Sequence, residues 1–584
     1  MIRTSQRKIL IKCALGQLPL DLVIENVQVV NVYTGRIEPG AIGIKAGYIV
    51  TTNAAGLPTR RRLDGKGSFA LPGFIDAHVH LDSTLVTPEN LAALIVPRGT
   101  TVMLADPMES ANVGGYQGLQ ALLTGKDQLA YHLFIEVSSR VPTAPGLETT
   151  GGELGLAEVR RILRWQETVS LGELDPSKVL GLRDEYLAKV GSAYQRGKIA
   201  NGHAAGLFGR DLEAYACGGL ADDHEGVDYN DALARLRLGL SVMVREGSTE
   251  RNLELILPDA LREELDTRHF LTCTDDKHPD DILEEGHIDY MVNRAIALGM
   301  PPIRAIQMAT LNAAEHFRID HLVGSLTPGR WADILLVDDL ANVTPRQVFF
   351  KGQLVAEAGQ LVIPIPEINY PVWFTRTFKV IRGKHAEDFS LSATAEIARV
   401  RLIELYPDQI INQSGTAELP VIDGLVQNDP SRDVLKLSVV ERYGKNGNIG
   451  TAFVRGFGLQ RGALASSVAH DHHNIIVVGT NDTDMAACVR AIEESQGGLA
   501  IAVDGEVIDA LPLPLGGLMN PAPVMEVIER LRRLTSISHE LGGVLPAPFM
   551  TISFISLPTV PELGLTDKGL VDVRNHKLIN TIMD

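Results

Sequence analysis

The sequence predicts an α/β protein built on a (β/α)8 barrel of the TIM type, with a small flanking β-sandwich domain and a C-terminal α+β domain. Three observations support this expectation. At 584 residues, the chain is too long for one hydrophobic core and should divide into several domains. Apolar strand-like runs alternate with helical stretches over residues 70–320. Strand-like blocks also lie on both sides of that region.

The flanking domain is predicted from two strand-like blocks that are far apart in the sequence. The first runs from Leu22 to Thr52, with turns indicated at Gly35 and Gly47. The second covers residues 332–355. Because the two blocks bracket the barrel region, we expect them to form one small β-sandwich domain from residues 1–70 and 321–365.

The barrel is predicted for residues 71–320. One helix should begin at Thr87-Pro88, because threonine is a favoured N-cap and proline suits the first helical position. Another should begin at Pro301-Pro302 and continue through a helical apolar face. The members of that face are Ile303, Ile306, Leu311, Ala314 and Phe317.

The C-terminal α+β domain is predicted for residues 366–584, after a proline-rich linker at residues 360–375. Within it, the patterns indicate strands at 434–441 and 474–478 and helices near 482–495 and 521–541.

Composition restricts the partners and the compartment. The net charge of −18 argues against binding to nucleic acid or to an anionic membrane surface. The four cysteines are far apart and include no Cys-x-x-Cys pair, which favours neither disulfides nor a thiolate zinc site. We find no signal peptide and no apolar run of ~18 residues. A cytoplasmic protein is therefore expected.

The most informative motif is the pair His78 and His80, which ends the apolar run Phe74-Ile75-Asp76-Ala77. Alternate residues of a strand point to the same side, so both imidazoles should leave one face together. Neutral imidazole is the commonest metal ligand in proteins. The pair therefore predicts a metal site at the end of a strand.

Four further candidate ligands end later apolar runs: Glu173, His203, His224 and Asp275. Barrel enzymes collect their catalytic groups at the C-terminal ends of strands. Together with His78 and His80, the set supplies four imidazoles and two carboxylates, which suffices for two divalent ions.

The chemistry expected of this set is hydrolytic. Glu173 can bridge both metals through its two oxygens, and a bridging water becomes hydroxide near neutral pH. Asp275 can ligate one metal and accept the proton of that water. We therefore predict Asp275 and Glu173 as the catalytic residues.

The chain resembles the amidohydrolase superfamily and, within it, the bacterial adenine deaminase family. The resemblance covers nearly the whole chain, including a C-terminal domain that most amidohydrolases lack. The runs that carry it are Pro72 to His80, Pro97-Arg98-Gly99-Thr100-Thr101, Gly202-His203, Asp223-His224-Glu225, Arg245-Glu246-Gly247-Ser248, Cys273-Thr274-Asp275-Asp276, His470-Asp471-His472-His473-Asn474 and Leu511 to Leu518.

The resemblance implies a function in purine salvage. A binuclear centre, with Mn²⁺ or Fe²⁺ favoured and Zn²⁺ possible, would convert adenine to hypoxanthine and ammonia. The bridging hydroxide would attack C6 of the purine. The family also implies a homo-oligomer, with a dimer favoured.

Two departures from the family pattern leave the substrate open. This chain has Asp82 where the family usually has glutamate, and Met108 where it usually has histidine. Another 6-substituted purine or amino-heterocycle is the alternative substrate. Two other functions also stay open: a cyclic amidohydrolase and a catalytically inactive barrel scaffold. Glu173 argues against the first, which commonly carries a carboxylated lysine at that strand, and the intact ligand set argues against the second.

Several neighbouring residues are candidates for substrate binding or for support of the ligands. They are Glu109, Arg245, Glu246, Ser248, Asp276 and His472. The cluster His470-Asp471-His472-His473 could bind metal or cover the active site, and its spacing does not decide between these roles.

Overall fold

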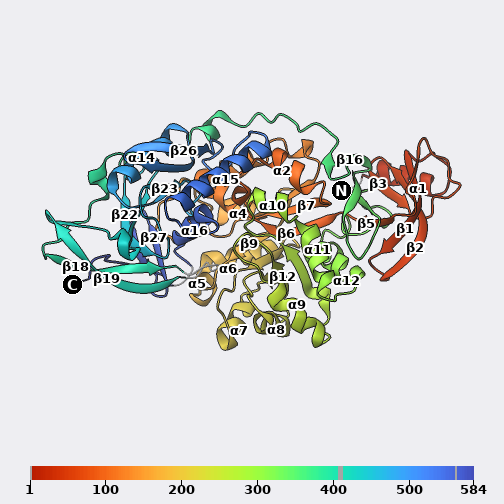
Figure 1. Ribbon diagram of the computed structural model, residues 1–584. Helices are drawn as coiled ribbons and strands as arrows, with labels where there is room; N and C mark the ends of the chain where they lie inside the picture. Colours follow the sequence, from red (N-terminus) through yellow and green to blue (C-terminus); the bar gives the residue numbers. More distant parts are fainter. Residues whose placement is uncertain (1–2, 406–411, 560–561, 584) are drawn as a thin grey trace.

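The computed structural model describes residues 3–405, 412–559 and 562–583. The molecule is elongated (Figure 1), with a β-sheet at one end formed by the N-terminal region and another at the opposite end formed by the C-terminal region. A mixed α/β region lies between them.

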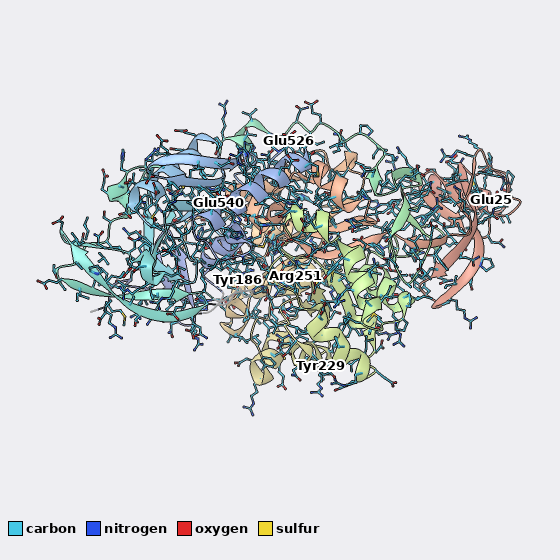
Figure 2. The ribbon with its side chains drawn as sticks, in the orientation of Figure 1. Glu25, Tyr186, Tyr229, Arg251, Glu526 and Glu540 are labelled. Carbon is cyan, nitrogen blue, oxygen red and sulfur yellow. The ribbon has the colours of Figure 1, made fainter. Side chains whose placement is uncertain are left out.

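The sheet at the N-terminal end combines strands from both flanks of the α/β region. Strand β14 (Ile334–Val337) lies between β5 (Phe69–Pro72) and β15 (Pro345–Phe350) and is antiparallel to both. Glu25, labelled in Figure 2, belongs to this sheet and forms an ion pair with Arg62. The other elements here are α1 (Thr4–Ala14), β1 (Leu22–Asn31), β2 (Arg36–Lys45), β3 (Tyr48–Thr51), β4 (Arg62–Asp64), β16 (Gln353–Glu357) and β17 (Gln360–Leu361).

The central region contains two parallel sheets, with strand orders β10-β9-β8-β7-β6 and β11-β12-β13. Backbone hydrogen bonds connect them at both ends. Asp275 N donates to His78 O at 3.0 Å, and Ala221 N donates to Ala200 O at 2.9 Å. The bounds are β6 (Phe74–Val79), β7 (Thr100–Ala105), β8 (His132–Val137), β9 (Thr168–Leu174), β10 (Ile199–Gly202), β11 (Asp222–Asp223), β12 (Ser241–Arg245) and β13 (Phe270–Cys273).

Every residue of these strands is buried, as expected for parallel strands that are covered on both sides. Helices α2 to α9 connect successive strands, and helices α10 to α13 follow the last of them, β13. They are α2 (Pro88–Ile95), α3 (Met108–Leu122), α4 (Leu156–Ile162), α5 (Pro176–Leu180), α6 (Asp184–Tyr194), α7 (Gly209–Cys217), α8 (Tyr229–Arg237), α9 (Leu253–Arg262), α10 (Pro279–Glu284), α11 (Ile288–Ala297), α12 (Pro302–Met308) and α13 (Leu311–His316).

Two predicted helix starts are confirmed. Helix α2 begins at Pro88 with Thr87 at the N-cap, and α12 begins at Pro302. The apolar face predicted as one helix is divided, however, because Thr310 leaves the helical conformation and α13 starts after it.

The C-terminal region carries a sheet of order β20-β19-β18-β22-β21-β24-β23-β25-β26 with helices packed against it. The chain reaches it through irregular structure at 362–371, which crosses one side of the molecule (Figure 1). The predicted strands and helices are present here as β21, β24, α14 and α15. The bounds are β18 (Ile397–Glu404), β19 (Gln413–Ile422), β20 (Leu425–Val426), β21 (Leu435–Val440), β22 (Ile449–Arg455), β23 (Ala463–Ser466), β24 (Ile475–Gly479), β25 (Gly498–Val503), β26 (Glu506–Pro512), α14 (Asp482–Glu494), α15 (Val524–Glu540), α16 (Pro548–Ile555), β27 (Leu563–Thr566), β28 (Gly569–Asp572) and β29 (Lys577–Ile579).

Across the residues that the structure describes, no helix is both long and apolar enough to cross a membrane.

Candidate metal centre

The six predicted metal ligands lie at the C-terminal ends of the parallel strands. His78 is in β6, and Glu173 is in β9. The others immediately follow β6, β10 and β11, or come two residues after the end of β13. All six are buried, and the fold brings them together because the strands are parallel. The full set is His78, His80, Glu173, His203, His224 and Asp275.

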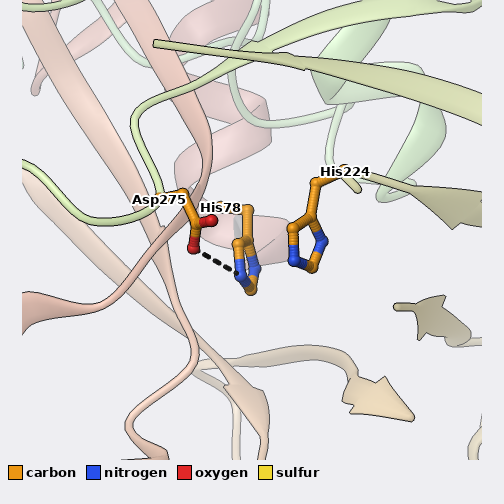
Figure 3. Close-up of side chains that lie close together, drawn as sticks. All are labelled: His78, His224 and Asp275. Atoms are coloured by element: carbon orange, nitrogen blue, oxygen red, sulfur yellow. Dashed lines mark ion pairs between the residues drawn. The ribbon is translucent and has the colours of Figure 1, made fainter. Parts of the chain in front are cut away.

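His78, His224 and Asp275 form one part of the cluster (Figure 3). The rings of His78 and His224 stack with their centroids 4.4 Å apart. Burial and the neighbouring His224 lower the pKa of His78 to about 4, so this ring is neutral at pH 7. Its Nδ1 lies 3.0 Å from a Glu136 carboxylate oxygen, which orients the ring.

Asp275 faces both histidines of the motif. Its Oδ1 lies 3.5 Å from Nε2 of His78 and 3.5 Å from Nε2 of His80. Asp275 has a φ of +57°, in the left-handed region that non-glycine residues rarely adopt. Its backbone N–H and C=O both bond to β6 or the residue after it, which holds the carboxylate against the histidines.

Glu173 connects the two halves of the cluster. Its Oε2 lies 2.8 Å from Nδ1 of His203 and 3.3 Å from Nε2 of His224. Its Oε1 lies 4.0 Å from Nε2 of His80. The two oxygens of one carboxylate therefore face two different sets of nitrogens.

The donor set fits divalent metal ions. Three groups of ligand atoms each lie within 4.8 Å of one another, all of them buried. Nε2 of His78 is buried and makes no hydrogen bond, which is expected of a nitrogen that serves as a metal ligand. The three groups are His78–His224–Asp275, His78–His80–Glu173 and Glu173–His203–His224.

Two buried arginines contact the carboxylates of the cluster. Arg140 forms an ion pair with Glu173, and Arg245 donates to Asp275 Oδ2 at 2.9 Å and to Glu225 Oε1 at 3.0 Å. Burial alone would raise the pKa values of Glu173 and Asp275, but the arginines and neighbouring histidines lower both. Both carboxylates are therefore ionised at neutral pH.

A cavity opens onto the cluster and is closed partly by the C-terminal region. Phe554 stacks on His470, with ring centroids 5.1 Å apart and planes inclined by 15°. Glu250 also lines the cavity, and its Oε2 is buried without a hydrogen-bond partner. Five of the six candidate ligands, all except His78, line the cavity, and the other lining residues are Arg140, Glu225, Arg245, Glu250, Asp276, His470, Asp471, Phe554, Leu557 and Thr559.

Three of the predicted supporting residues lie in the cavity lining or contact a residue of it. Arg245 and Asp276 line the cavity. Glu109 lies outside the lining but reaches the site through His80, whose Nδ1 is 2.8 Å from Oε1 of Glu109.

Glu246, Ser248 and His472 make structural contacts away from the cavity lining. Glu246 accepts from the backbone N–H of Leu253 at the start of α9. Ser248 bonds to Asp281 and accepts from the backbone of His278. Nδ1 of His472 accepts from the backbone N–H of Asn474.

Met108 and Asp82, the two departures from the family pattern, both have buried side chains. Met108 is buried, with its sulfur 3.8 Å from Oγ1 of Thr143, and it does not line the cavity. Asp82 is buried with its Oδ2 3.3 Å from Nε2 of His473.

Sequence reasoning missed Arg140, Glu225, Glu250 and Phe554. Arg140 and Glu225 come shortly after β8 and β11, so the rule that located the ligands applies to them as well. Glu250 lies in a longer loop and Phe554 in α16, and no local pattern marks either as part of the site.

Comparison with known proteins places this arrangement in a family. Residues 69–355 match the amidohydrolase family, and residues 409–577 match the adenine deaminase C-terminal domain. The chain is 53% identical over 575 residues to an adenine deaminase of Desulforamulus reducens, covering 98% of each chain. This chain belongs to the adenine deaminase family.

Further members of the adenine deaminase family match over nearly their whole length. The adenine deaminase of Desulfatibacillum aliphaticivorans is 41% identical over 571 residues, and that of Moorella thermoacetica is 39% identical over 580 residues. The first covers 98% of each chain, and the second covers 98% of this chain and 97% of the relative. The family likeness therefore spans both the central region and the C-terminal region.

Proposed function

We propose that this protein is an adenine deaminase, which hydrolyses adenine to hypoxanthine and ammonia in purine salvage. The observation that carries the proposal is 53% identity over 98% of the chain to a relative named adenine deaminase. The buried cluster of histidines and carboxylates supports it independently, because hydrolytic deamination needs an activated water.

We also propose the architecture and its boundaries. The parallel strands β6 to β13, joined by hydrogen bonds at both ends, support a closed (β/α)8 barrel over residues 71–320. The sheet shared by strands of both flanks supports one small composite domain, proposed as a β-sandwich, from residues 1–70 and 321–365. The match at 409–577 supports an α+β domain over residues 366–584.

Two divalent ions, Mn²⁺ or Fe²⁺, are proposed to bind the six buried ligands. His78, His80 and Asp275 would hold one ion and His203 and His224 the other, with Glu173 shared between them. When bound, such ions lower the pKa of a water molecule and polarise the substrate. Imidazole and carboxylate ligands suit both metals.

Asp275 is proposed to move the proton. Its carboxylate is ionised, and its position against two histidines leaves it facing the cavity. It can take a proton from the attacking water and deliver it to the leaving nitrogen at C6 of the purine. Arg245 fixes its orientation through the bond to Oδ2.

The cavity offers features that suit a flat, nitrogen-rich ring. Phe554 gives an apolar face next to the polar groups. Burial raises the pKa of Glu250 to about 8, so this carboxyl is protonated at pH 7 and can donate a hydrogen bond to a ring nitrogen.

The remaining alternatives are less well supported. Met108 does not line the cavity, so its difference from the family does not require a changed substrate. A cyclic amidohydrolase of the type with a carboxylated lysine is disfavoured, because Glu173 occupies that position. A scaffold function would not need six buried ligands.

The test is to incubate Mn²⁺-loaded protein with adenine and, separately, with N6-methyladenine, and to measure ammonia or methylamine. We expect fast ammonia release from adenine. Release only from the methylated purine would assign the alternative substrate class. Inactivity on both, with two metals bound, would leave a hydrolase of a different substrate.

A further inference from the structure

A second group of ligand-type side chains lies at the junction between the central region and the C-terminal region. Asp82 is in the 3-10 turn Leu81–Thr84 that follows β6, whereas His470 and His473 are in the loop between β23 and β24. All three are buried, and their ligand atoms lie within 4.8 Å of one another. None of them belongs to the six ligands described above.

The hydrogen bonds of His473 leave one ring nitrogen directed at Asp82. Its Nδ1 lies 2.6 Å from the backbone oxygen of Asp471, and a carbonyl only accepts, so Nδ1 carries the proton. In the neutral ring, Nε2 then carries a lone pair and no proton, and this atom lies 3.3 Å from Oδ2 of Asp82. Two atoms bound at about 2.1 Å to the same first-row ion are typically separated by about 3.0–3.4 Å.

A bound cation would also stabilise the negative charge of the buried carboxylates around Asp82. Oδ1 of Asp82 is buried and makes no hydrogen bond. Neighbouring Asp276 is buried as well, with Oδ1 3.9 Å from Nε2 of His470. Within the described residues, no lysine or arginine forms an ion pair with either carboxylate. Buried carboxylates are costly unless a positive charge compensates them.

We propose that Asp82, His470 and His473 bind a third divalent cation, separate from the binuclear centre. Two histidines with one carboxylate suit Fe²⁺ or Mn²⁺ and leave positions for water. The ring centroids of His470 and His80 lie 6.3 Å apart, so this site adjoins the first one. The ion ties the 470–473 loop to the turn after β6 and thereby fixes the C-terminal wall of the cavity. This inference does not depend on which substrate the protein hydrolyses.

The test is a metal count combined with crystallography on the full-length protein. The protein is loaded with Mn²⁺ and freed of excess metal by gel filtration. Its manganese content per chain is then measured by inductively coupled plasma mass spectrometry. We expect three Mn²⁺ per chain in the wild type and two in His473→Ala. The matched control is His472→Ala, which removes the neighbouring buried histidine and should retain three.

Anomalous scattering from Mn²⁺-loaded wild-type crystals locates each ion without any variant, so a folding defect in His473→Ala does not decide the outcome. A peak between Asp82 and His473 supports the proposal. A wild-type count of two with no such peak would overturn it and assign an ion pair between these side chains. A count of three that His473→Ala leaves unchanged would also overturn it. A missing peak at Glu173 would instead count against the binuclear centre.

Discussion

Oε2 of Glu173 lies 2.8 Å from Nδ1 of His203, across the boundary between strands β9 and β10. The other oxygen of the same carboxylate faces His80. One side chain thus connects His203, which follows the edge strand β10, with His80, which follows the opposite edge strand β6.

Glu173 is the side chain proposed to be shared by the two metal ions. Glu173→Gln should lose at least one of the two metal ions proposed for the centre, because an amide supplies one weak oxygen donor in place of two anionic ones. Metal content per chain is the measurement. Glu167→Gln is the control, since Glu167 lies just before β9 and pairs with Lys126 on the surface. Full metal retention in Glu173→Gln would exclude the bridge.

Asp275→Asn should reduce kcat for adenine by about 100- to 10,000-fold while the fold survives. The amide cannot accept the proton, and it weakens one metal ligand. Steady-state kinetics and near-UV circular dichroism are the measurements. Asp280→Asn, at the start of α10 and outside the cavity lining, is the control and should stay close to wild type. Near wild-type turnover in Asp275→Asn would refute the proposed proton transfer.

The affinity for Mn²⁺ should increase with pH. Burial alone would lower the pKa values of His80 and His224, but Glu109 beside the first and Glu173 beside the second raise them well above the ordinary histidine value. Metals bind the deprotonated imidazole, so each protonated ring must release its proton first. Affinity should therefore rise by about tenfold per pH unit for each proton released, up to the raised pKa.

Calorimetric titration of the metal-free protein with Mn²⁺ checks this expectation. Repeating it in two buffers of different ionisation enthalpy counts the protons released. An affinity that is constant from pH 6 to pH 8, with no proton release, would contradict it.

Glu250 should make KM for adenine depend on pH. Because burial raises its pKa to about 8, the carboxyl donates a hydrogen bond below that pH and loses the ability as it ionises above it. KM should therefore rise by about 3- to 10-fold above pH 8. Glu250→Gln should remove this rise, because its amide keeps a donor at every pH.

Glu246→Gln provides the comparison for Glu250, since Glu246 bonds to the backbone of Leu253 away from the cavity. Its KM profile should follow that of the wild type. If Glu250→Gln kept the wild-type rise, another group would be responsible for it.

The sequence predicted that the six candidate ligands would lie together, because one rule applies to all of them. Each lies at or just after the end of an apolar strand, and parallel strands place those ends on one side. The start of α2 was predictable for a similarly local reason, the pairing of Thr87 with Pro88.

Other features could not be predicted because they depend on packing between distant segments. Phe554 lies in an apolar helix whose pattern indicates only burial, and its position over the cavity follows from contact with His470. Glu246 and Ser248 lie near the ligands in the sequence, but their side chains bond to neighbouring backbone and loop residues. Proximity in sequence alone therefore did not place these two side chains in the cavity lining.

The position of β14 between β5 and β15 has a consequence for biosynthesis. On the ribosome, the N-terminal strands emerge before the central helices and strands. Strand β14, which pairs with β5, is absent until residues 334–337 have been synthesised. During that interval the β5 edge exposes unpaired backbone groups, which is where nascent chains associate with one another. Truncated chains that end before residue 334 should therefore require chaperones, even when their central strands are complete.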